Sequence, residues 1–451
     1  MKIELSIPLL LSKIAEAAGG TLDSPDGLIT SVCTNTSEAS EGTLFFALGK
    51  GEEYVGRLRK PELFVSAVTR GGIFVNDTVD ALVRLASYYK TRLTHLKKTV
   101  LITGSVGKTS LKDFTAEMLA SKFKVHKTAG NFNNNIGLPL SILSAPSDTE
   151  ILVLEVGMNH EGEIAPLSLA VNPDIAVITN VGTAHIGNLG SREAIAKAKT
   201  EVTLGLAENG YVITPSDEPL LTGLKNAVTL GEGGDFALNV KKKTAEETVF
   251  DISADGISVK DVFLPFGGVH FAKAVGFSTV IAHLLGMTEA EISAALKKSE
   301  VFQPRPHTVD LGKFTLYDDS YNASIESYEA DFELLSLSGK RTGAVIGDVL
   351  ELGSDAEKIH EKIGVLAHKY RISKIYPFGK YAPFVAKGAI SAGFDKSSIF
   401  TVTNPDSHAL CAELIIKNTE ADALVLIKGS RRMKTEKITA YIKDALGEEN
   451  D

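Results

Sequence analysis

The stretch ITGSVGKTS at residues 102–110 decides the fold of the middle of this chain. It follows the apolar, β-branched run TVLIT at residues 99–103, and it precedes a segment in which Leu111, Phe114 and Met118 fall on one helical face. A strand, a glycine-containing loop and a helix in this order form the context of a phosphate-binding loop, where backbone N–H groups and the helix N-terminus face phosphate oxygens. The alternative is a tight strand–helix turn with a solvated lysine.

The residue types in this loop suit a nucleoside triphosphate bound with Mg²⁺. Lys108 would reach the β- and γ-phosphates as a catalytic cation, and the Thr109 hydroxyl would bind the metal ion. The usual signature has a glycine five residues before Gly107, where this chain has Ile102. We expect nucleotide contacts from Gly104, Ser105, Val106, Gly107, Lys108, Thr109 and Ser110.

Further strand-like runs lie on both sides of this loop. EILVLEV at 150–156 and DIAVIT at 174–179 are apolar on both faces and are separated by helical segments, which favours a parallel sheet covered on both sides. The stretch 236–266 instead alternates and contains a DG turn, which predicts antiparallel strands. FTLYDDS, GAVIGDV, KIYPFG, SIFTVT and ALVLIKGS, which follow residue 309, predict the strands of a second doubly wound domain.

The chain is therefore expected to have an α/β fold with three domains. Its 451 residues are too many for a single compact core. We predict a small α/β N-terminal domain at 1–95, a central P-loop ATPase domain with a mostly parallel sheet at 96–308, and a C-terminal Rossmann-like domain at 309–451. QPRP at 303–306 is a plausible linker, because two prolines stiffen it.

The composition narrows the class of protein. The formal net charge of −9 argues against a generic nucleic-acid or anionic-membrane surface, and no apolar run is long enough for stable membrane insertion. The two cysteines, Cys33 and Cys411, lie far apart and form no disulfide framework. We expect a cytoplasmic protein and, since no dimer seam is evident, a monomer.

Motifs beyond the loop resemble those of the Mur ligases. The short TGSxGKTS form is similar to the ATP loop of that family and of the folylpolyglutamate synthases. Three segments resemble the central domain of Mur ligases and three more resemble the C-terminal domain. These segments are TAGNFNNNIGLPLSIL (128–143), LEVGMNHEGEI (154–164), TNVGTAHIGNLGS (179–191), YDDSYNAS (317–324), IGDVLELG (346–353) and LIKGSRRM (426–433).

The resemblance implies an ATP-dependent amide ligase of peptidoglycan precursor synthesis. The motifs are most similar to those members that join D-alanyl-D-alanine to UDP-N-acetylmuramoyl-tripeptide through an acyl phosphate, a reaction in which cations and positioning do most of the catalysis. A Mur-type ligase with a different carboxyl donor or amine, and a P-loop ATPase without ligation, are the alternatives. A folylpolyglutamate-type synthase is disfavoured, because that family generally lacks an N-terminal UDP-binding domain.

Candidate metal and catalytic residues follow the apolar strands. Glu155 stands at the carboxyl end of a strand, where open parallel sheets bind ligands, and we assign it to Mg²⁺; a capping or salt-bridged glutamate is the alternative. The resemblance adds His185 as a metal ligand and Lys199 as the lysine that reacts with CO₂ to form a carbamate, although Thr200 replaces the usual glycine after it. Arg305 matches the arginine near the hinge that contacts the ATP phosphates.

The resemblance also implies how the adenosine would bind. Asp319 matches the carboxylate that holds the ATP ribose. The family usually carries HNxxN before the last long helix of the central domain, but residues 270–274 of this chain read HFAKA and lack both asparagines. Phe271 would stack on the base or would simply belong to the core.

Substrate contacts are expected from all three domains. Asn131, Asn133 and Asn134 would lie beside the muramoyl-peptide, or would cap the next helix. The first domain would bind the UDP part through the segment that matches TDSRxxxPGD, in which Thr36 is a candidate contact but Asn35 replaces the acid. The C-terminal residues that would position the dipeptide are Tyr321, Asn322, Lys428, Ser430 and Arg431.

Overall fold

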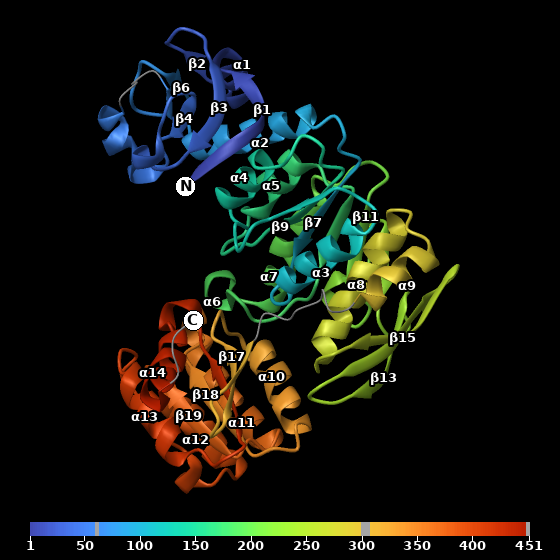
Figure 1. The fold of residues 1–451 in the computed structure, drawn as a ribbon, viewed down its shortest axis with the longest axis vertical. Helices are drawn as coiled ribbons and strands as arrows, with labels where there is room; N and C mark the ends of the chain where they lie inside the picture. The colour runs from blue at the N-terminus through green and yellow to red at the C-terminus, as the bar shows by residue number, and fades with distance from the viewer. Residues whose placement is uncertain (59–62, 299–306, 448–451) are drawn as a thin grey trace.

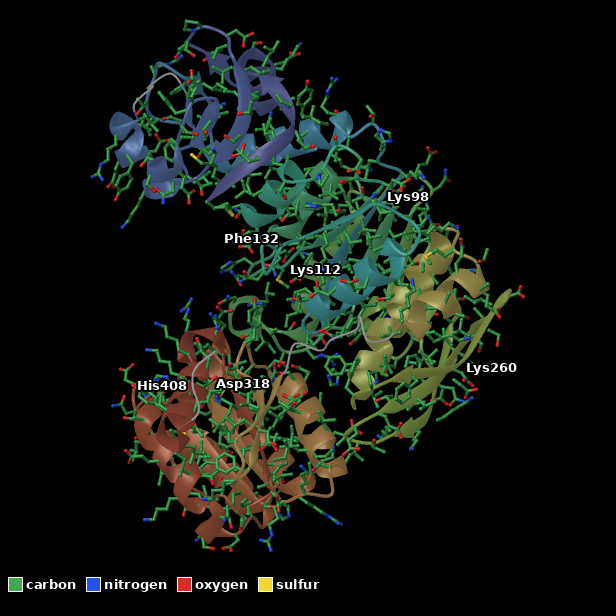
Figure 2. All side chains as sticks on the ribbon, viewed as in Figure 1. Lys98, Lys112, Phe132, Lys260, Asp318 and His408 are labelled. Atoms are coloured by element: carbon green, nitrogen blue, oxygen red, sulfur yellow. The ribbon has the colours of Figure 1, made fainter. Side chains whose placement is uncertain are left out.

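A computed structural model describes residues 1–58, 63–298 and 307–447; Figure 1 shows its ribbon, and Figure 2 shows the side chains on that ribbon in the same view. An N-terminal α/β unit lies beside a large central sheet with a small antiparallel sheet attached, and a further sheet forms the other end of the molecule. We use the terms N-terminal, central and C-terminal domain for the elements β1–α2, β7–α9 and β16–α14. The α/β class with three such units agrees with the sequence prediction.

The N-terminal domain is a mixed sheet with helices. Its strand order is β1-β3-β4-β5-β6-β2, and its first helix ends at Gly19, which takes the left-handed conformation expected for a glycine after a helix. The elements are β1 (Lys2–Leu10), α1 (Leu11–Ala18), β2 (Thr21–Leu22), β3 (Leu28–Cys33), the 3₁₀ helices η1 (Thr36–Glu38) and η2 (Gly49–Arg57), β4 (Thr43–Phe46), β5 (Phe64–Ser66), β6 (Ile73–Phe74) and α2 (Thr78–Arg92).

The central domain carries the predicted parallel sheet, with strand order β12-β11-β10-β7-β9-β8 and parallel pairing throughout. Its elements are β7 (Lys98–Thr103), α3 (Lys108–Ala120), β8 (Val125–Lys127), α4 (Gly137–Leu143), β9 (Ile151–Glu155), α5 (Ile164–Val171), β10 (Ile175–Ile178), α6 (Ile186–Leu189), α7 (Arg192–Thr200), η3 (Glu201–Thr203), β11 (Tyr211–Pro215), η4 (Pro219–Leu221), β12 (Ala227–Leu230), β13 (Ala237–Lys243), β14 (Thr248–Ala254), β15 (Ile257–Leu264), α8 (Val269–Leu284) and α9 (Glu289–Lys297).

Both faces of this sheet are buried, which explains its near-continuous apolar strands. Leu101 and Leu152 face a core that continues into the N-terminal domain, whereas Val100 and Val153 face a second core under the antiparallel sheet β13-β14-β15. The first core joins helices α2 and α4, so that the N-terminal and central domains share apolar packing. The predicted antiparallel strands at 236–266 are confirmed.

The C-terminal domain has the strand order β16-β17-β20-β18-β19, with β16 antiparallel to β17 and the other pairs parallel. Its elements are β16 (His307–Asp310), β17 (Thr315–Asp319), α10 (Ile325–Leu337), β18 (Thr342–Gly347), η6 (Gly353–Asp355), α11 (Ala356–Lys369), β19 (Lys374–Phe378), α12 (Ala382–Ala392), η7 (Lys396–Ser398), α13 (His408–Asn418), β20 (Leu424–Lys428), η8 (Arg431–Met433) and α14 (Glu436–Leu446).

One predicted strand of this domain is wrong. SIFTVT at 398–403 forms only isolated bridges, at Ile399 and Val402, with the neighbouring strand β19. The amides of Phe400 and Val402 donate to carbonyls of β19, but Pro377 in β19 has no N–H with which to donate in return. The ladder therefore stays incomplete at this edge.

No helix in the described ranges combines the length and apolar character needed to cross a membrane.

Candidate active site

A cavity of about 620 Å³ lies between the central and C-terminal domains. The central domain lines it with the loop after β7 and with residues that follow β9 and β10. The C-terminal domain lines it with residues that follow β17, β18 and β20. Because β7 pairs with both β9 and β10, the carboxyl ends of these three strands lie side by side, which is the position where open parallel sheets bind their ligands.

The loop at 104–110 has the backbone of a phosphate-binding loop. A side chain at Gly104 would place its Cβ 1.8 Å from the Thr179 hydroxyl, so that only glycine fits there. Gly107 has a φ of +81°, and α3 begins at the next residue. The first N–H groups of α3 have no partner within the helix, and Lys108, Thr109 and Ser110 line the cavity. The predicted loop is therefore present with a helix N-terminus behind it.

The Lys108 ammonium is held at the base of this loop. Its Nζ donates to the carbonyl of Gly104 at 2.8 Å. Burial lowers the pKa of Lys108, and the nearby charge of Glu155 acts in the opposite direction. The predicted phosphate-binding lysine and the predicted metal-binding carboxylate are thus close enough to influence each other.

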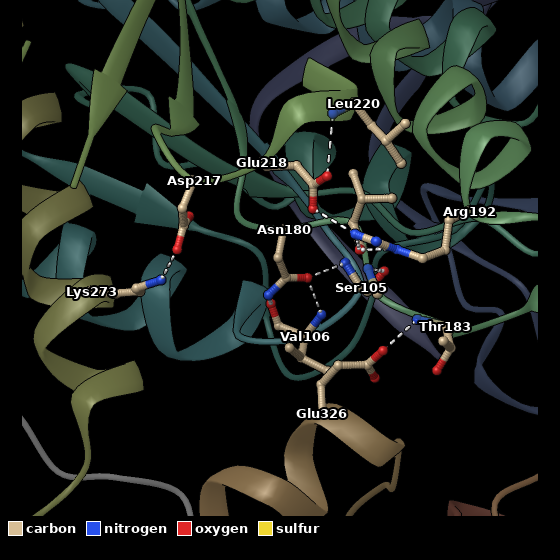
Figure 3. A network of polar contacts seen from close by, with 12 residues as sticks. Ser105, Val106, Asn180, Thr183, Arg192, Asp217, Glu218, Leu220, Lys273 and Glu326 are labelled. Carbon is tan, nitrogen blue, oxygen red and sulfur yellow. Dashed lines mark hydrogen bonds and ion pairs between the residues drawn. The ribbon is translucent and has the colours of Figure 1, made fainter. Parts of the chain in front are cut away.

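Asn180, which our sequence analysis missed, shapes the loop from the end of β10 (Figure 3). Its Oδ1 accepts from the N–H groups of Ser105 and Val106, each at 3.0 Å, and its Nδ2 donates to the Val106 carbonyl at 3.2 Å. The hydroxyl of Thr179 donates to the same carbonyl at 2.7 Å. Two N–H groups of the loop are therefore occupied by Asn180, and the later ones remain for an anion.

Glu155 is a buried carboxylate with one oxygen that has room for a cation as its partner. Its side chain is only 1% exposed, and Oε1 accepts from the Nδ2 of Asn133 at 2.7 Å. Within the described residues Oε2 is buried without a hydrogen-bond partner. An unpaired buried carboxylate oxygen is costly, so the site favours a cation beside it. Oxygen donors of Glu155 and of Thr109, which lines the same cavity, are the type that Mg²⁺ prefers.

His185 also lines the cavity, but it is engaged by the C-terminal domain. Its Nδ1 lies 2.6 Å from Oε2 of Glu351, and burial lowers its pKa. Among the described residues no group of three His, Cys, Asp or Glu side chains is arranged to hold a metal ion. A metal ion here would thus draw at most two ligands from these four residue types, with other oxygen donors such as the Thr109 hydroxyl beside them.

Lys199 is deeply buried, with 2% exposure, although it does not line the cavity. Burial lowers its pKa well below the usual value for lysine, and the positive charge of Lys108 adds to this effect. Lys197 instead points outward and forms an ion pair with Glu161 at 2.5 Å. The two lysines of α7 thus point to different sides of the helix, as their spacing of two residues requires.

The three asparagines after β8 all line the cavity but act differently. Asn133 binds Glu155, as described above. The Oδ1 of Asn134 accepts from the N–H of Gly137 at 2.8 Å, at the start of α4, so that the capping interpretation holds for this residue. Asn131 lies at the cavity surface, and its carbonyl accepts from the N–H of Asn133.

Lys428 does not have the free ammonium group expected of a substrate-binding lysine. Its side chain is 1% exposed and forms ion pairs with both Asp319 and Asp331. Burial raises the pKa of Asp319 to about 6; the ammonium of Lys428 opposes this shift and Asp331 adds to it. Asp319 also lines the cavity, and its Oδ2 accepts from Lys428, so its role at the ribose stays a prediction. The sequence could not reveal this buried triad, because its members come from β17, α10 and β20.

The other C-terminal candidates meet at the cavity. Tyr321 and Asn322 are exposed, and the Arg431 guanidinium lies 5.8 Å from the centre of the Tyr321 ring. The Ser430 hydroxyl is mostly buried and accepts from the N–H of Leu350 at 3.0 Å, which gives it a structural role in joining two loops. Arg431 forms an exposed ion pair with Glu436.

Thr36, like Lys199 and Gly104, is not among the residues that line the cavity. Thr36 lies in η1 of the N-terminal domain, away from the residues that line it. Arg305 lies outside the described residues. Phe271 is a core residue, with 3% exposure and an edge-on contact to Phe266 at 5.2 Å, although it also borders the cavity beside His270.

The comparisons with known proteins agree with this geometry. Residues 102–279 match the Mur ligase middle domain. The UDP-N-acetylmuramoyl-tripeptide–D-alanyl-D-alanine ligase of Bacillus subtilis is 35% identical to this chain, over 97% of the chain and 98% of that protein. The enzyme of the same name from Escherichia coli is 29% identical over 97% of the chain.

Solved structures show the same arrangement of domains. MurF from Acinetobacter baumannii covers 98% of this chain with a TM-score of 0.88 at 24% identity, a likeness of fold. MurF from Thermotoga maritima in complex with ADP covers 92% of this chain and 97% of its own, with a TM-score of 0.78 and 26% identity. The chain therefore belongs to the Mur ligase family, among the UDP-N-acetylmuramoyl-tripeptide–D-alanyl-D-alanine ligases.

Proposed function

We propose that this chain is an ATP-dependent amide ligase that joins D-alanyl-D-alanine to UDP-N-acetylmuramoyl-tripeptide in the synthesis of peptidoglycan precursors. The observation that carries the proposal is the cavity, where a phosphate-binding loop and Glu155 from the central domain face Tyr321, Asn322 and Arg431 from the C-terminal domain. The 35% identity to a ligase of this name over nearly the whole chain supports the same substrates.

The reaction needs an activated carboxyl group. A carboxylate oxygen of the tripeptide attacks the γ-phosphorus of ATP, and ADP leaves, so that an acyl phosphate forms. The neutral amine of the dipeptide then attacks the carbonyl carbon, the tetrahedral intermediate expels phosphate, and the nitrogen loses a proton to complete the amide. Both steps concentrate negative charge, so positive groups and fixed N–H donors provide most of the catalysis.

The residues of the loop divide this work. The N–H groups at the start of α3 would bind the phosphates, and Lys108 would leave the Gly104 carbonyl to reach the β- and γ-phosphates. Glu155 Oε2 and the Thr109 hydroxyl would hold Mg²⁺, which when bound supplies positive charge to the phosphate oxygens. His185, which Glu351 orients, is the third group that we assign to this metal.

We propose that Lys199 carries a carbamate. Burial lowers the pKa of Lys199 and so favours the neutral amine, the form that attacks CO₂. Its conversion to an anion would also balance the positive charge of Lys108. We expect Lys199→Ala to be nearly inactive and to recover part of its activity with small added carboxylates, whereas Lys197→Ala, on the exposed side of the same helix, should stay active. Normal turnover by Lys199→Ala would refute the carbamate.

The domains would divide the substrates. We propose that residues 1–95 bind the UDP part, that residues 96–308 bind ATP, and that residues 309–451, including Ser430 as a structural support, close over ATP and bind the dipeptide. Arg305 remains a proposed phosphate contact at the boundary of the last two. We further propose that the enzyme acts as a cytoplasmic monomer, which light scattering of the purified chain would test.

The decisive experiment measures phosphate release with each substrate omitted in turn. We expect release from ATP only when UDP-N-acetylmuramoyl-tripeptide and D-alanyl-D-alanine are both present, together with the new amide in a mass spectrum. Robust ATP hydrolysis with neither substrate would favour a non-ligating ATPase. Activity only with another nucleotide-sugar peptide or another amine would favour a Mur-type ligase of different specificity.

A further inference from the structure

The loop between β10 and α6, residues 179–185, contacts the C-terminal domain through Glu326 (Figure 3). Glu326 lies in the first turn of α10, and its Oε1 accepts from the backbone N–H of Thr183 at 2.6 Å. Its other carboxylate oxygen is buried and has no hydrogen-bond partner in the part of the chain that the structure describes. The carboxylate is thus committed to one short, charge-assisted contact across the domain boundary.

The absence of a side chain at Gly182 makes this contact possible. A Cβ at this position would lie 2.7 Å from Oε1 and 2.8 Å from Cδ of Glu326, and its three nearest atoms would all belong to that carboxylate group. The φ of Gly182 lies outside the left-handed region, so alanine can adopt this backbone. The contact between Glu326 and the loop therefore depends specifically on the small size of residue 182.

Residues 179–185 also form hydrogen bonds with the phosphate-binding loop of their own domain. The N–H of Gly182 donates to the Ser105 hydroxyl at 2.8 Å, and Asn180 binds the N–H groups of Ser105 and Val106. Arg192 donates to the Val181 carbonyl at 2.7 Å. Glu326 on one domain and the phosphate-binding loop on the other thus bind adjacent peptide groups of a single short segment.

We propose that Glu326 is a positioning residue that couples docking of the C-terminal domain to the arrangement of the phosphate-binding loop. Its carboxylate holds Thr183, which places Gly182 and Asn180 against Ser105 and Val106. The inference rests on the ATP site proposed above; Glu326 borders the same cavity, but the one hydrogen bond of its carboxylate among the described residues goes to the loop and not to Lys108 or Glu155. It predicts that a change on α10 alters ATP binding although α10 belongs to the other domain.

The test compares Glu326→Ala with a matched control on the same helix. Glu333 also reaches the central domain, where it pairs with Lys243 at 2.5 Å, but this pair is solvent-exposed and should contribute little. We expect Glu326→Ala to weaken binding of a non-hydrolysable ATP analogue by about tenfold, and Glu333→Ala to leave it within about twofold of the wild type. Glu326→Gln, which keeps an acceptor oxygen, should recover most of the affinity.

Gly182→Ala provides an independent test, because its new methyl group would displace the Glu326 carboxylate. We expect this variant to weaken ATP-analogue binding as much as Glu326→Ala does, and the double variant to be no worse than either single one. Additive losses would show that the two residues act separately and would overturn the proposal.

Calorimetric titration and thermal melting of the whole chain provide the readouts. A loss of stability without a change in the affinity for the ATP analogue would assign Glu326 a structural role only and refute the coupling. Affinities of Glu326→Ala and Glu333→Ala that are equal to that of the wild type would also refute it. Failure of the wild type itself to bind the analogue would instead refute the ATP site, which keeps the two proposals distinguishable.

Discussion

Replacement of Asn180 by alanine should weaken ATP binding although its side chain makes no phosphate contact in our assignment. The amide of Asn180 forms three hydrogen bonds with the phosphate-binding loop, two from N–H groups at 3.0 Å and one to a carbonyl at 3.2 Å. Each such bond contributes about 0.5–1.5 kcal/mol net. Ser105 keeps a weaker bond to the Asn180 carbonyl at 3.3 Å, so we count two bonds as lost.

The variant should therefore lose about 2 kcal/mol of the free energy that favours the observed loop conformation over other conformations. If the altered loop must recover this shape to bind phosphate, the dissociation constant for an ATP analogue should rise by about thirtyfold. Isothermal titration calorimetry of the wild type and Asn180→Ala measures this directly. Asn188→Ala is a suitable control, because Asn188 lies exposed in the nearby helix α6.

The reasoning fails if Asn180→Ala binds the analogue within about twofold of the wild type while its secondary structure is intact. It also fails if Asn188→Ala weakens binding to the same extent, because the effect would then come from the segment as a whole. A third outcome, tighter binding by Asn180→Ala, would mean that the freed N–H groups of Ser105 and Val106 bind phosphate themselves and that Asn180 competes with ATP.

Three further predictions concern stability and charge. Glu155→Gln should lose at least about a hundredfold in ligation rate but should raise the melting temperature, since it removes a buried charge with an unpaired oxygen; a lower melting temperature in a thermal scan would contradict this. Tyr328→Phe should cost about 1–2 kcal/mol in denaturant titration, because the Tyr328 hydroxyl lies 2.9 and 3.0 Å from two strand-end carbonyls; an unchanged midpoint would refute the estimate. Because the pKa of Asp319 is raised to about 6, the folded state binds a proton there that the unfolded state has lost, so this group should make the free energy of unfolding fall as pH rises from about 4 to about 6. Asp331→Asn should reduce that fall, and equal slopes in both proteins in urea titrations across this range would contradict the assignment.

Local signals were sufficient for the elements that carry the site. The loop 102–110 could be predicted because a strand, two glycines and a helix follow one another directly in the sequence. A cation-binding role could be proposed for Glu155 from the sequence, because an unpaired carboxylate at the end of a fully apolar strand is costly without a cation or hydrogen-bond donors. The spacing of Lys197 and Lys199 on one helix also predicts that they point to different sides, but only the structure shows that Lys199 is the buried one.

Other features depend on contacts between segments far apart in the sequence. Lys428 was predicted to position the dipeptide, but two carboxylates from other elements form ion pairs with it inside its own domain. The segment 398–403 read as a strand, but Pro377 of the neighbouring strand deprives it of a donor. Such pairings depend on register and packing, which the local pattern does not contain.

The sequence by itself determined the class of fold, the phosphate-binding loop and the family, since these depend on periodicity and on residues adjacent in the chain. Only the tertiary structure decided which N–H groups of that loop are already bound, because Asn180 reaches them from a neighbouring strand end. It also decided that Glu326 binds the central domain, because that contact exists only where the central and C-terminal domains meet. Hydrogen bonds of this kind link positions more than 70 residues apart, and side-chain geometry in three dimensions selects them.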